Sequence, residues 1–74
     1  MAESVYKVIE LVGTSDTSWE KAAEAAVKRA AKSIRDLRIA EVTKLDMQLE
    51  DGKPALFRAK LSVSFKFESK GKDK

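Results

Sequence analysis

Three carboxylates that could bind a metal ion lie close together in the second half of the chain. Asp46, Glu50 and Asp51 fall in or beside a turn that the sequence predicts at Asp51-Gly52. Carboxylate oxygens are ligands for hard cations, and Ca²⁺ takes about six to eight oxygens. One copy of the chain would supply two or three of these oxygens. A calcium site here therefore needs further oxygens from a symmetric interface between copies. Ordinary solvation of a turn and a strand edge is the competing interpretation.

The residue types on which most enzymes rely are missing. The 74 residues include no histidine and no cysteine, which removes the commonest general base and the strongest nucleophile. The three glycines, Gly13, Gly52 and Gly71, stand alone and form no phosphate-binding loop. We therefore expect a protein that is not an enzyme. Disulfides and a zinc finger are also excluded as ways to stabilise so small a fold.

The charges indicate neither nucleic acid nor membrane as a partner. The chain has 15 Lys and Arg against 12 Asp and Glu, a net charge of +3. Acids and bases interleave, whereas a nucleic-acid surface clusters its basic residues. No apolar run approaches the roughly 20 residues of a membrane span. The residues after Met1, Ala2-Glu3-Ser4, lack the basic and apolar segments of a signal peptide, so we expect a cytoplasmic protein.

The first half of the chain predicts a strand followed by a helix. β-Forming residues run from Val5 to Val12, so we expect a strand over about 4–13 that Gly13 ends. Thr17 and Glu20 have the spacing of a capping box, which predicts a helix over about 18–36. Its apolar positions recur at helical spacing and are mostly alanine, so they bury little area. They are Trp19, Ala22, Ala23, Ala26, Val27, Ala30, Ala31 and Ile34.

The second half predicts a hairpin of two strands. A strand is expected over about 38–50, and its apolar parity switches near Thr43. Either a bulge or bend reconciles the two halves, or each half buries a different face against a different neighbour. Asp51-Gly52 is a strong hairpin signal, and the strand after it, over about 54–68, alternates apolar and polar residues cleanly. Residues 69–74 are expected to form a disordered tail.

These elements predict a single α+β domain over residues 1–68 with β-α-β-β order. A right-handed crossover through the helix, with the first strand beside the third, gives a three-stranded antiparallel sheet of order 1-3-2 packed on one helix. The other face of the sheet and its edges stay uncovered. A core of this size rarely supplies more than about 3–5 kcal/mol. We therefore expect copies of the chain to stabilise one another.

Several segments of the sequence resemble the dodecin family. They are the opening Val5-Tyr6-Lys7-Val8-Ile9-Glu10-Leu11-Val12-Gly13-Thr14-Ser15, the alanine-rich helix, the segment Leu37-Arg38-Ile39-Ala40-Glu41-Val42, the hairpin, and the closing Val63-Ser64-Phe65-Lys66-Phe67. The resemblance covers about residues 4–68. It implies a β-α-β-β protomer, a hollow homododecamer of 23 symmetry, and a role in storing or buffering flavin.

The resemblance also implies ligand-binding positions, and two of them differ here. In flavin-binding dodecins a tryptophan opens the second strand in an L-x-W-x-E-V context, where this chain has Arg38, Ile39 and Glu41. A glutamine of the third strand is replaced by Arg58. Isoleucine lacks the aromatic face that stacks on a flavin ring, and the charge of Arg58 needs an anion or a neighbouring acid such as Glu41. Family position therefore implies Ile39, Arg58, Glu41 and Arg38 as ligand-binding residues, with flavin stacking lost.

Three functions stay open at this point. The first is a non-enzymatic homododecameric shell that binds or buffers a small ligand or ion. The second is a store for riboflavin or FMN with a rearranged pocket. The third is an assembly that binds calcium or another divalent cation through Asp46, Glu50 and Asp51. The sequence fixes no cofactor, and the partners it predicts are further copies of the chain and a small molecule or ion.

Overall fold

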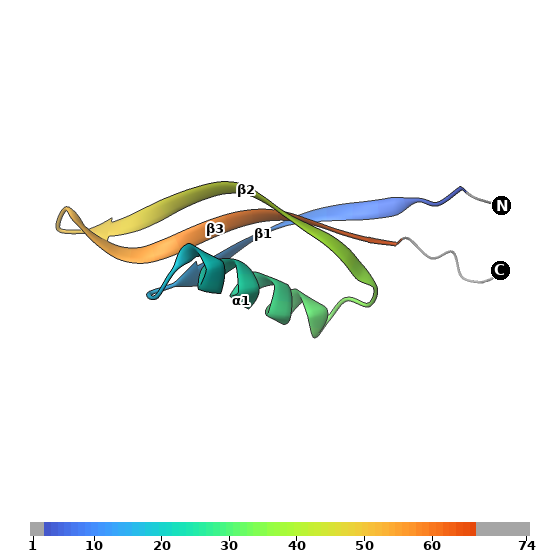
Figure 1. Ribbon diagram of the computed structural model, residues 1–74, viewed down its shortest axis with the longest axis horizontal. Helices are drawn as coiled ribbons and strands as arrows, with labels where there is room; N and C mark the ends of the chain where they lie inside the picture. The colour runs from blue at the N-terminus through green and yellow to red at the C-terminus, as the bar shows by residue number, and fades with distance from the viewer. Residues whose placement is uncertain (1–2, 67–74) are drawn as a thin grey trace.

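The computed structural model describes residues 3–66, and the predicted disordered tail at 69–74 lies outside them (Figure 1). The elements follow in the order β1 (Tyr6–Ser15), α1 (Trp19–Ala31), β2 (Leu37–Glu50) and β3 (Lys53–Lys66). The strands form one sheet of order β1-β3-β2, and both neighbouring pairs are antiparallel. The predicted β-α-β-β fold is therefore confirmed. In the part of the chain described, no helix is long and apolar enough to cross a membrane.

The helix begins one residue later than the predicted capping box. Ser18 has extended backbone angles and its Oγ accepts a hydrogen bond of 3.0 Å from the backbone N–H of Lys21, so Ser18 is the N-cap. The hydroxyl of Thr17 instead donates to the carboxylate of Asp16 at 3.2 Å. Glu20 lies in the first turn, where its charge suits the helix dipole.

The helix also ends earlier than the expected boundary near residue 36. It stops at Ala31, and the backbone N–H groups of Lys32 and Ser33 bond to carbonyls only three residues back. Asp36 then takes a left-handed φ of 61° and redirects the chain into β2. Backbone of this kind cannot continue a right-handed helix, so no helix could have run through the expected boundary at residue 36.

Gly13 lies beneath the helix, inside β1, although the sequence predicted that it ends the strand. β1 continues to Ser15, and Gly13 pairs with Ala59 of β3. A Cβ at this position would collide with the backbone carbonyl of Ala22 and come within 3.0 Å of the Cβ of Ala26. The glycine is thus required by close helix–sheet packing and does not break the strand.

The core lies between α1 and the central strand β3. The alternation predicted for β3 is confirmed, because every second residue from Ala59 to Val63 is buried. Leu61 and Val63 are the only large side chains that the described structure buries completely. The rest of the core is alanine, which makes it thin. The buried apolar residues are Ala22, Ala26, Ala30, Ala59, Leu61 and Val63.

A bulge in β2 reconciles the two halves of that strand. The pairing of β2 with β3 shifts register between Val42 and Lys44, and the Thr43 hydroxyl donates to the Lys60 carbonyl at 3.1 Å. Val42 before the bulge and Leu45 after it pair with the buried residues Leu61 and Ala59. Both halves of β2 therefore turn their apolar residues toward the helix side of the sheet, as the first of the two sequence interpretations predicted.

The predicted hairpin turn is confirmed in its detail. Asp51 and Gly52 join β2 to β3, with φ angles of 53° and 75°. Positive φ at both central residues is the geometry of a two-residue type I′ turn, which matches the twist of the strands it joins. The turn carries Asp51 to the far end of the long β2–β3 ribbon (Figure 1).

Candidate functional site

No element of the described part of the chain covers the face of the sheet that turns away from α1. We call it the outer face. Cross-strand pairing arranges its side chains in rows: Val8 and Ile39 both pair with Ser64, and Glu10 and Glu41 both pair with Ser62. The two following rows are Val12, Lys60 and Lys44, and then Thr14, Arg58 and Asp46. All the residues that family position implies, apart from Arg38, lie in these rows.

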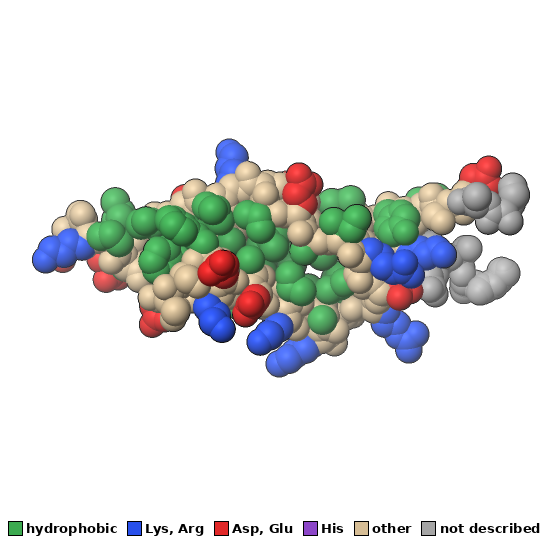
Figure 2. All heavy atoms as spheres, viewed as in Figure 1, with side chains coloured by type: hydrophobic (Ala, Val, Ile, Leu, Met, Phe, Trp, Pro, Cys, Tyr) green, Lys and Arg blue, Asp and Glu red, His purple; other side chains and the backbone are tan. Residues whose placement is uncertain are grey.

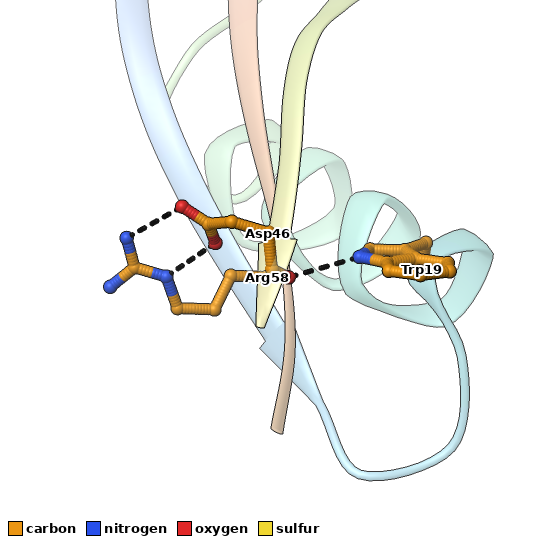
Figure 3. A network of polar contacts seen from close by, with 3 residues as sticks. All are labelled: Trp19, Asp46 and Arg58. Carbon is orange, nitrogen blue, oxygen red and sulfur yellow. Dashed lines mark hydrogen bonds and ion pairs between the residues drawn. The ribbon is translucent and has the colours of Figure 1, made fainter. Parts of the chain in front are cut away.

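Arg58 is neutralised within its own chain, by Asp46 of the adjacent strand (Figure 3). The guanidinium donates to the carboxylate through Nε at 2.8 Å and Nη2 at 3.1 Å. Bidentate pairs of this kind are strong and geometrically specific. The hydrogen bond from Arg58 lowers the pKa of Asp46 below its usual value of 3.8, and Lys60 and Lys44 lower it further. The same bond raises the pKa of Arg58.

Glu41, which the sequence offered as the acid for Arg58, is not the one that binds it. Glu41 pairs with Ser62, which is four residues from Arg58 along β3, or roughly 13 Å at the rise of a strand. Asp46 instead lies directly opposite Arg58. The bulge at Thr43 sets this register, and a sequence without a known register does not reveal which acid faces which base.

Trp19 also contacts the segment of β2 that contains Asp46. Its indole Nε1 donates a 3.0 Å hydrogen bond to the backbone carbonyl of Asp46 (Figure 3). Its ring meets Phe57 edge to face, with ring centroids 5.0 Å apart and planes inclined at 69°. The tryptophan therefore packs on the sheet and fastens the start of α1 to β2 and β3. Sequence reasoning anticipated the packing but not the bond to Asp46.

The residues that family position implies do not converge within one chain. Ile39 is 64% exposed and its partner Ser64 lies six residues from Arg58 along β3, roughly 20 Å away. Arg38 contacts Asp36 through an exposed ion pair of 3.8 Å. A small ligand that touches both Ile39 and Arg58 would therefore need one of them from a second copy.

The three carboxylates proposed as metal ligands are also dispersed. Asp46 is engaged by Arg58, Glu50 pairs with Lys53 of β3, and Asp51 lies in the turn. Residues 3–66 contain no group of three or more Asp or Glu side chains placed to hold a metal ion. A calcium site with this donor set would require oxygens from several copies.

A strip of large apolar side chains is exposed on the helix side of β2. Leu45, Met47 and Leu49, which we call the β2 strip, are between 40% and 57% exposed. The helix packs on β1 and β3 and hardly reaches β2. Figure 2 shows hydrophobic side chains gathered in this region. The alternation in the sequence indicated that these β2 residues share one face. It did not indicate that the helix would leave them exposed.

A groove of about 320 Å³ lies next to the β2 strip, between α1 and β2. Val42 forms part of its wall and is itself 46% exposed. Because Val42 and Leu45 lie on the same side of β2, the groove and the β2 strip form one continuous apolar surface. The charged side chains on its helix wall are Glu24 and Lys28. The full lining is Ala23, Glu24, Val27, Lys28, Ala40, Val42 and Leu61.

Known proteins similar to this chain agree with its fold. The sequence model of the family Dodecin matches residues 5–68. The calcium dodecin of Mycobacterium tuberculosis is 52% identical over 63 residues, which cover 85% of this chain and 89% of the relative. The dodecin of Thermus thermophilus is 38% identical over 64 residues, covering 86% and 93%.

Two solved structures show the same likeness in three dimensions. The dodecin of Streptomyces coelicolor superposes with a TM-score of 0.86 at 38% identity, covering 93% of this chain and 99% of its own. The calcium-chelating calcium dodecin of Mycobacterium tuberculosis superposes with a TM-score of 0.80 at 49% identity, covering 90% and 96%. Its structure was described as having a novel calcium-binding site.

Proposed function

The chain belongs to the dodecin family, and on that premise we propose that twelve copies assemble with 23 symmetry into a closed shell. The shell binds or buffers a small ligand or ion, and it catalyses no reaction. Calcium is the ligand that we place first. The proposal has two parts, assembly and binding, which different features of the molecule support.

Assembly is supported above all by one observation, the exposed β2 strip. Burying the exposed half of a large aliphatic side chain contributes about 1 kcal/mol, so the strip of Leu45, Met47 and Leu49 offers about 3 kcal/mol to an interface. The intrachain core is thin, because Leu61 and Val63 are the only large side chains completely buried among residues 3–66. Contacts between copies would therefore supply a substantial share of the stability of the folded chain.

Calcium is favoured by the 52% identical relative, which is a calcium dodecin, and by the donors at the hairpin end of the chain. Glu50 and Asp51 are exposed there, and exposed carboxylates suit a hard cation. Asp46 already binds Arg58 through both carboxylate oxygens, which weakens it as a ligand for a cation. Because residues 3–66 bring no three acids together, the proposed site combines carboxylate and carbonyl oxygens from neighbouring copies.

Storage of riboflavin or FMN is the second candidate, favoured by the exposed apolar Ile39. The residues present fit a flavin ring poorly. Ile39 has no aromatic face, and Trp19 is committed to Phe57 and to the Asp46 carbonyl. A flavin bound at Ile39 would rest on aliphatic contacts in place of stacking between tryptophans.

A calorimetric titration of the assembled protein tests the binding part. The protein is first treated with chelator, and Ca²⁺ and FMN are then titrated into separate samples. We expect a heat of binding when Ca²⁺ is added. When FMN is added, we expect its fluorescence, followed in parallel, to stay unquenched. Micromolar FMN binding with strong quenching, together with no response to Ca²⁺, would replace calcium by flavin as the ligand.

A further inference from the structure

The turn between β2 and β3 places an aspartate directly before a glycine whose backbone nitrogen is unhindered. Asp51-Gly52 is the only Asp-Gly pair in the 74 residues, and both residues are exposed. A Cβ added to Gly52 would meet no atom within 4 Å. The Gly52 nitrogen can therefore approach the side-chain carboxyl group of Asp51, with which it would close a five-membered ring.

The two groups that would react have no partners to lose among the described residues. The other three aspartates within residues 3–66 each bind a neighbouring side chain, whereas no hydrogen bond or ion pair in that range engages Asp51. Glu50 and Lys53 form the last pair of the β2–β3 ladder, so the N–H of Gly52 between them has no partner strand. Both groups are therefore free to meet.

The hairpin end is held less firmly than the rest of the sheet. β1 ends at Ser15, opposite Phe57, so the ribbon nearer the turn has only two strands, and two-stranded ribbons are marginally stable. The pairing also shifts register between Gln48 and Leu49, close to the turn. Figure 1 shows the turn projecting beyond α1 and the end of β1. Local opening there lets the left-handed backbone of Asp51 rotate into the geometry of ring closure.

We propose that Asp51 is a site of spontaneous isomerisation to isoaspartate. The Gly52 nitrogen attacks the side-chain carboxyl carbon of Asp51, an N–C bond forms and a C–O bond breaks. One water leaves, made from the O–H of the protonated carboxyl group and the proton of the nitrogen. Water then adds to the main-chain carbonyl of the five-membered imide, which leaves Gly52 bonded to the side-chain carbon and frees a carboxylate on Cα. No oxidant or reductant takes part.

The product changes the hairpin end. The main chain through residue 51 gains one carbon, and its carboxylate moves from the side chain to Cα. A two-residue type I′ turn needs two ordinary residues of positive φ, so the isomerised chain loses this turn and, with it, the pairing of Glu50 with Lys53. The inference goes beyond the proposed ligand binding and does not depend on it.

Ageing of the assembled wild-type protein in the presence of chelator tests the inference. After weeks at neutral pH, an isoaspartyl methyltransferase with labelled S-adenosylmethionine measures isoaspartate. An aspartate-specific protease, which does not cleave at isoaspartate, then locates it. We expect labelling with loss of cleavage at Asp51, and a minor peptide lighter by one water, which is the imide. The other three described aspartates precede Thr17, Leu37 and Met47, whose side chains hinder the attack, and should stay cleavable in the same sample.

A variant and an unfolded sample make the test specific to this turn. Gly52→Ala places a Cβ beside the attacking nitrogen and should accumulate less isoaspartate than wild type, with circular dichroism to establish that it is folded. Folded wild type should isomerise no more than about tenfold slower than the same chain in urea, because opening the hairpin end costs little. The inference fails if the folded protein is slower than that, if Gly52→Ala ages as fast as wild type, or if the other aspartates isomerise equally.

Discussion

Arg58 and Asp46 face each other across β3 and β2, and the guanidinium donates to both oxygens of the carboxylate, at 2.8 Å and 3.1 Å. The pair has two consequences for function. Arg58 needs no bound anion to balance its charge, so its presence does not by itself imply a phosphate ligand. Asp46 in turn is a weaker ligand for a cation, because the guanidinium already occupies one acceptor position on each of its oxygens.

The Asp46–Arg58 pair predicts an acid-sensitive contribution to stability. Because the folded-state pKa of Asp46 is lowered, the pair stabilises the fold above the usual carboxyl pKa of 3.8, and this contribution is lost as the pH falls through the lowered value. We expect Asp46→Asn to be less stable than wild type at neutral pH, and the difference to shrink toward about pH 3. Both side chains are exposed, so the effect is small. Urea unfolding at fixed protein concentration measures it, and a difference that does not change with pH would contradict it.

Gly13 predicts a large effect from a single methyl group. In Gly13→Ala the new Cβ collides with the backbone carbonyl of Ala22, and we expect a loss of about 3 kcal/mol, since α1 must move off the sheet. Gly52→Ala is the matched control: its Cβ meets no atom within 4 Å, but its φ is 75°, which costs about 1 kcal/mol. Thermal melts compare them, and equal losses in the two variants would contradict the role assigned to Gly13.

Trp19 predicts separable contributions from its ring and its N–H. Trp19→Phe keeps an aromatic ring near Phe57 but loses the hydrogen bond to the Asp46 carbonyl, which we expect to cost about 1 kcal/mol. Trp19→Ala also loses the ring contact and the apolar area that the ring buries, and should cost about 2 kcal/mol more. Chemical unfolding followed by circular dichroism measures both variants, because the fluorophore itself is removed. Equal stability of Trp19→Phe and wild type would show that the bond contributes nothing.

We predict that Glu50 and Asp51, at the hairpin end of the chain, are calcium ligands. Glu50→Gln with Asp51→Asn removes two charges, and asparagine tolerates the φ of 53° at position 51. We expect calcium affinity to fall by about tenfold or more, because ligand charge sets affinity. Asp46→Asn should have a smaller effect, since Asp46 is bound to Arg58. Calorimetric titration with Ca²⁺ measures the affinity of each variant. Only variants whose assembly has the wild-type size are compared. Unaltered calcium binding by the double variant would exclude these two residues as ligands.

The sequence predicted the topology well because its strongest signals are local. Alternation in the last strand, the Asp51-Gly52 turn and the parity switch at Thr43 each depend on a few neighbouring residues, and the structure confirms all three. The helix start was displaced by one residue, because Thr17 and Ser18 are both good caps and the backbone at Ser18 decides between them. The helix ends at Ala31, before the apolar spacing ends at Ile34, so the spacing alone does not reveal this boundary.

The arrangement of the candidate site was harder to predict because it depends on register and on the path of the helix. The partner of Arg58 is Asp46 and not Glu41 because of the bulge at Thr43. The β2 strip is bare because α1 lies over β1 and β3. Neither fact follows from the order of residues along the chain. The first follows once the strands are paired, and the second follows once the path of α1 over the sheet is known.

A native mass spectrum of the wild-type protein is the most direct test of the central claim that this chain functions as a closed shell. It reports the number of subunits and any bound non-protein mass together. We predict twelve copies of the 8.2 kDa chain, with calcium adducts that chelator removes. A spectrum of single chains, with no larger assembly at any protein concentration, would contradict the account.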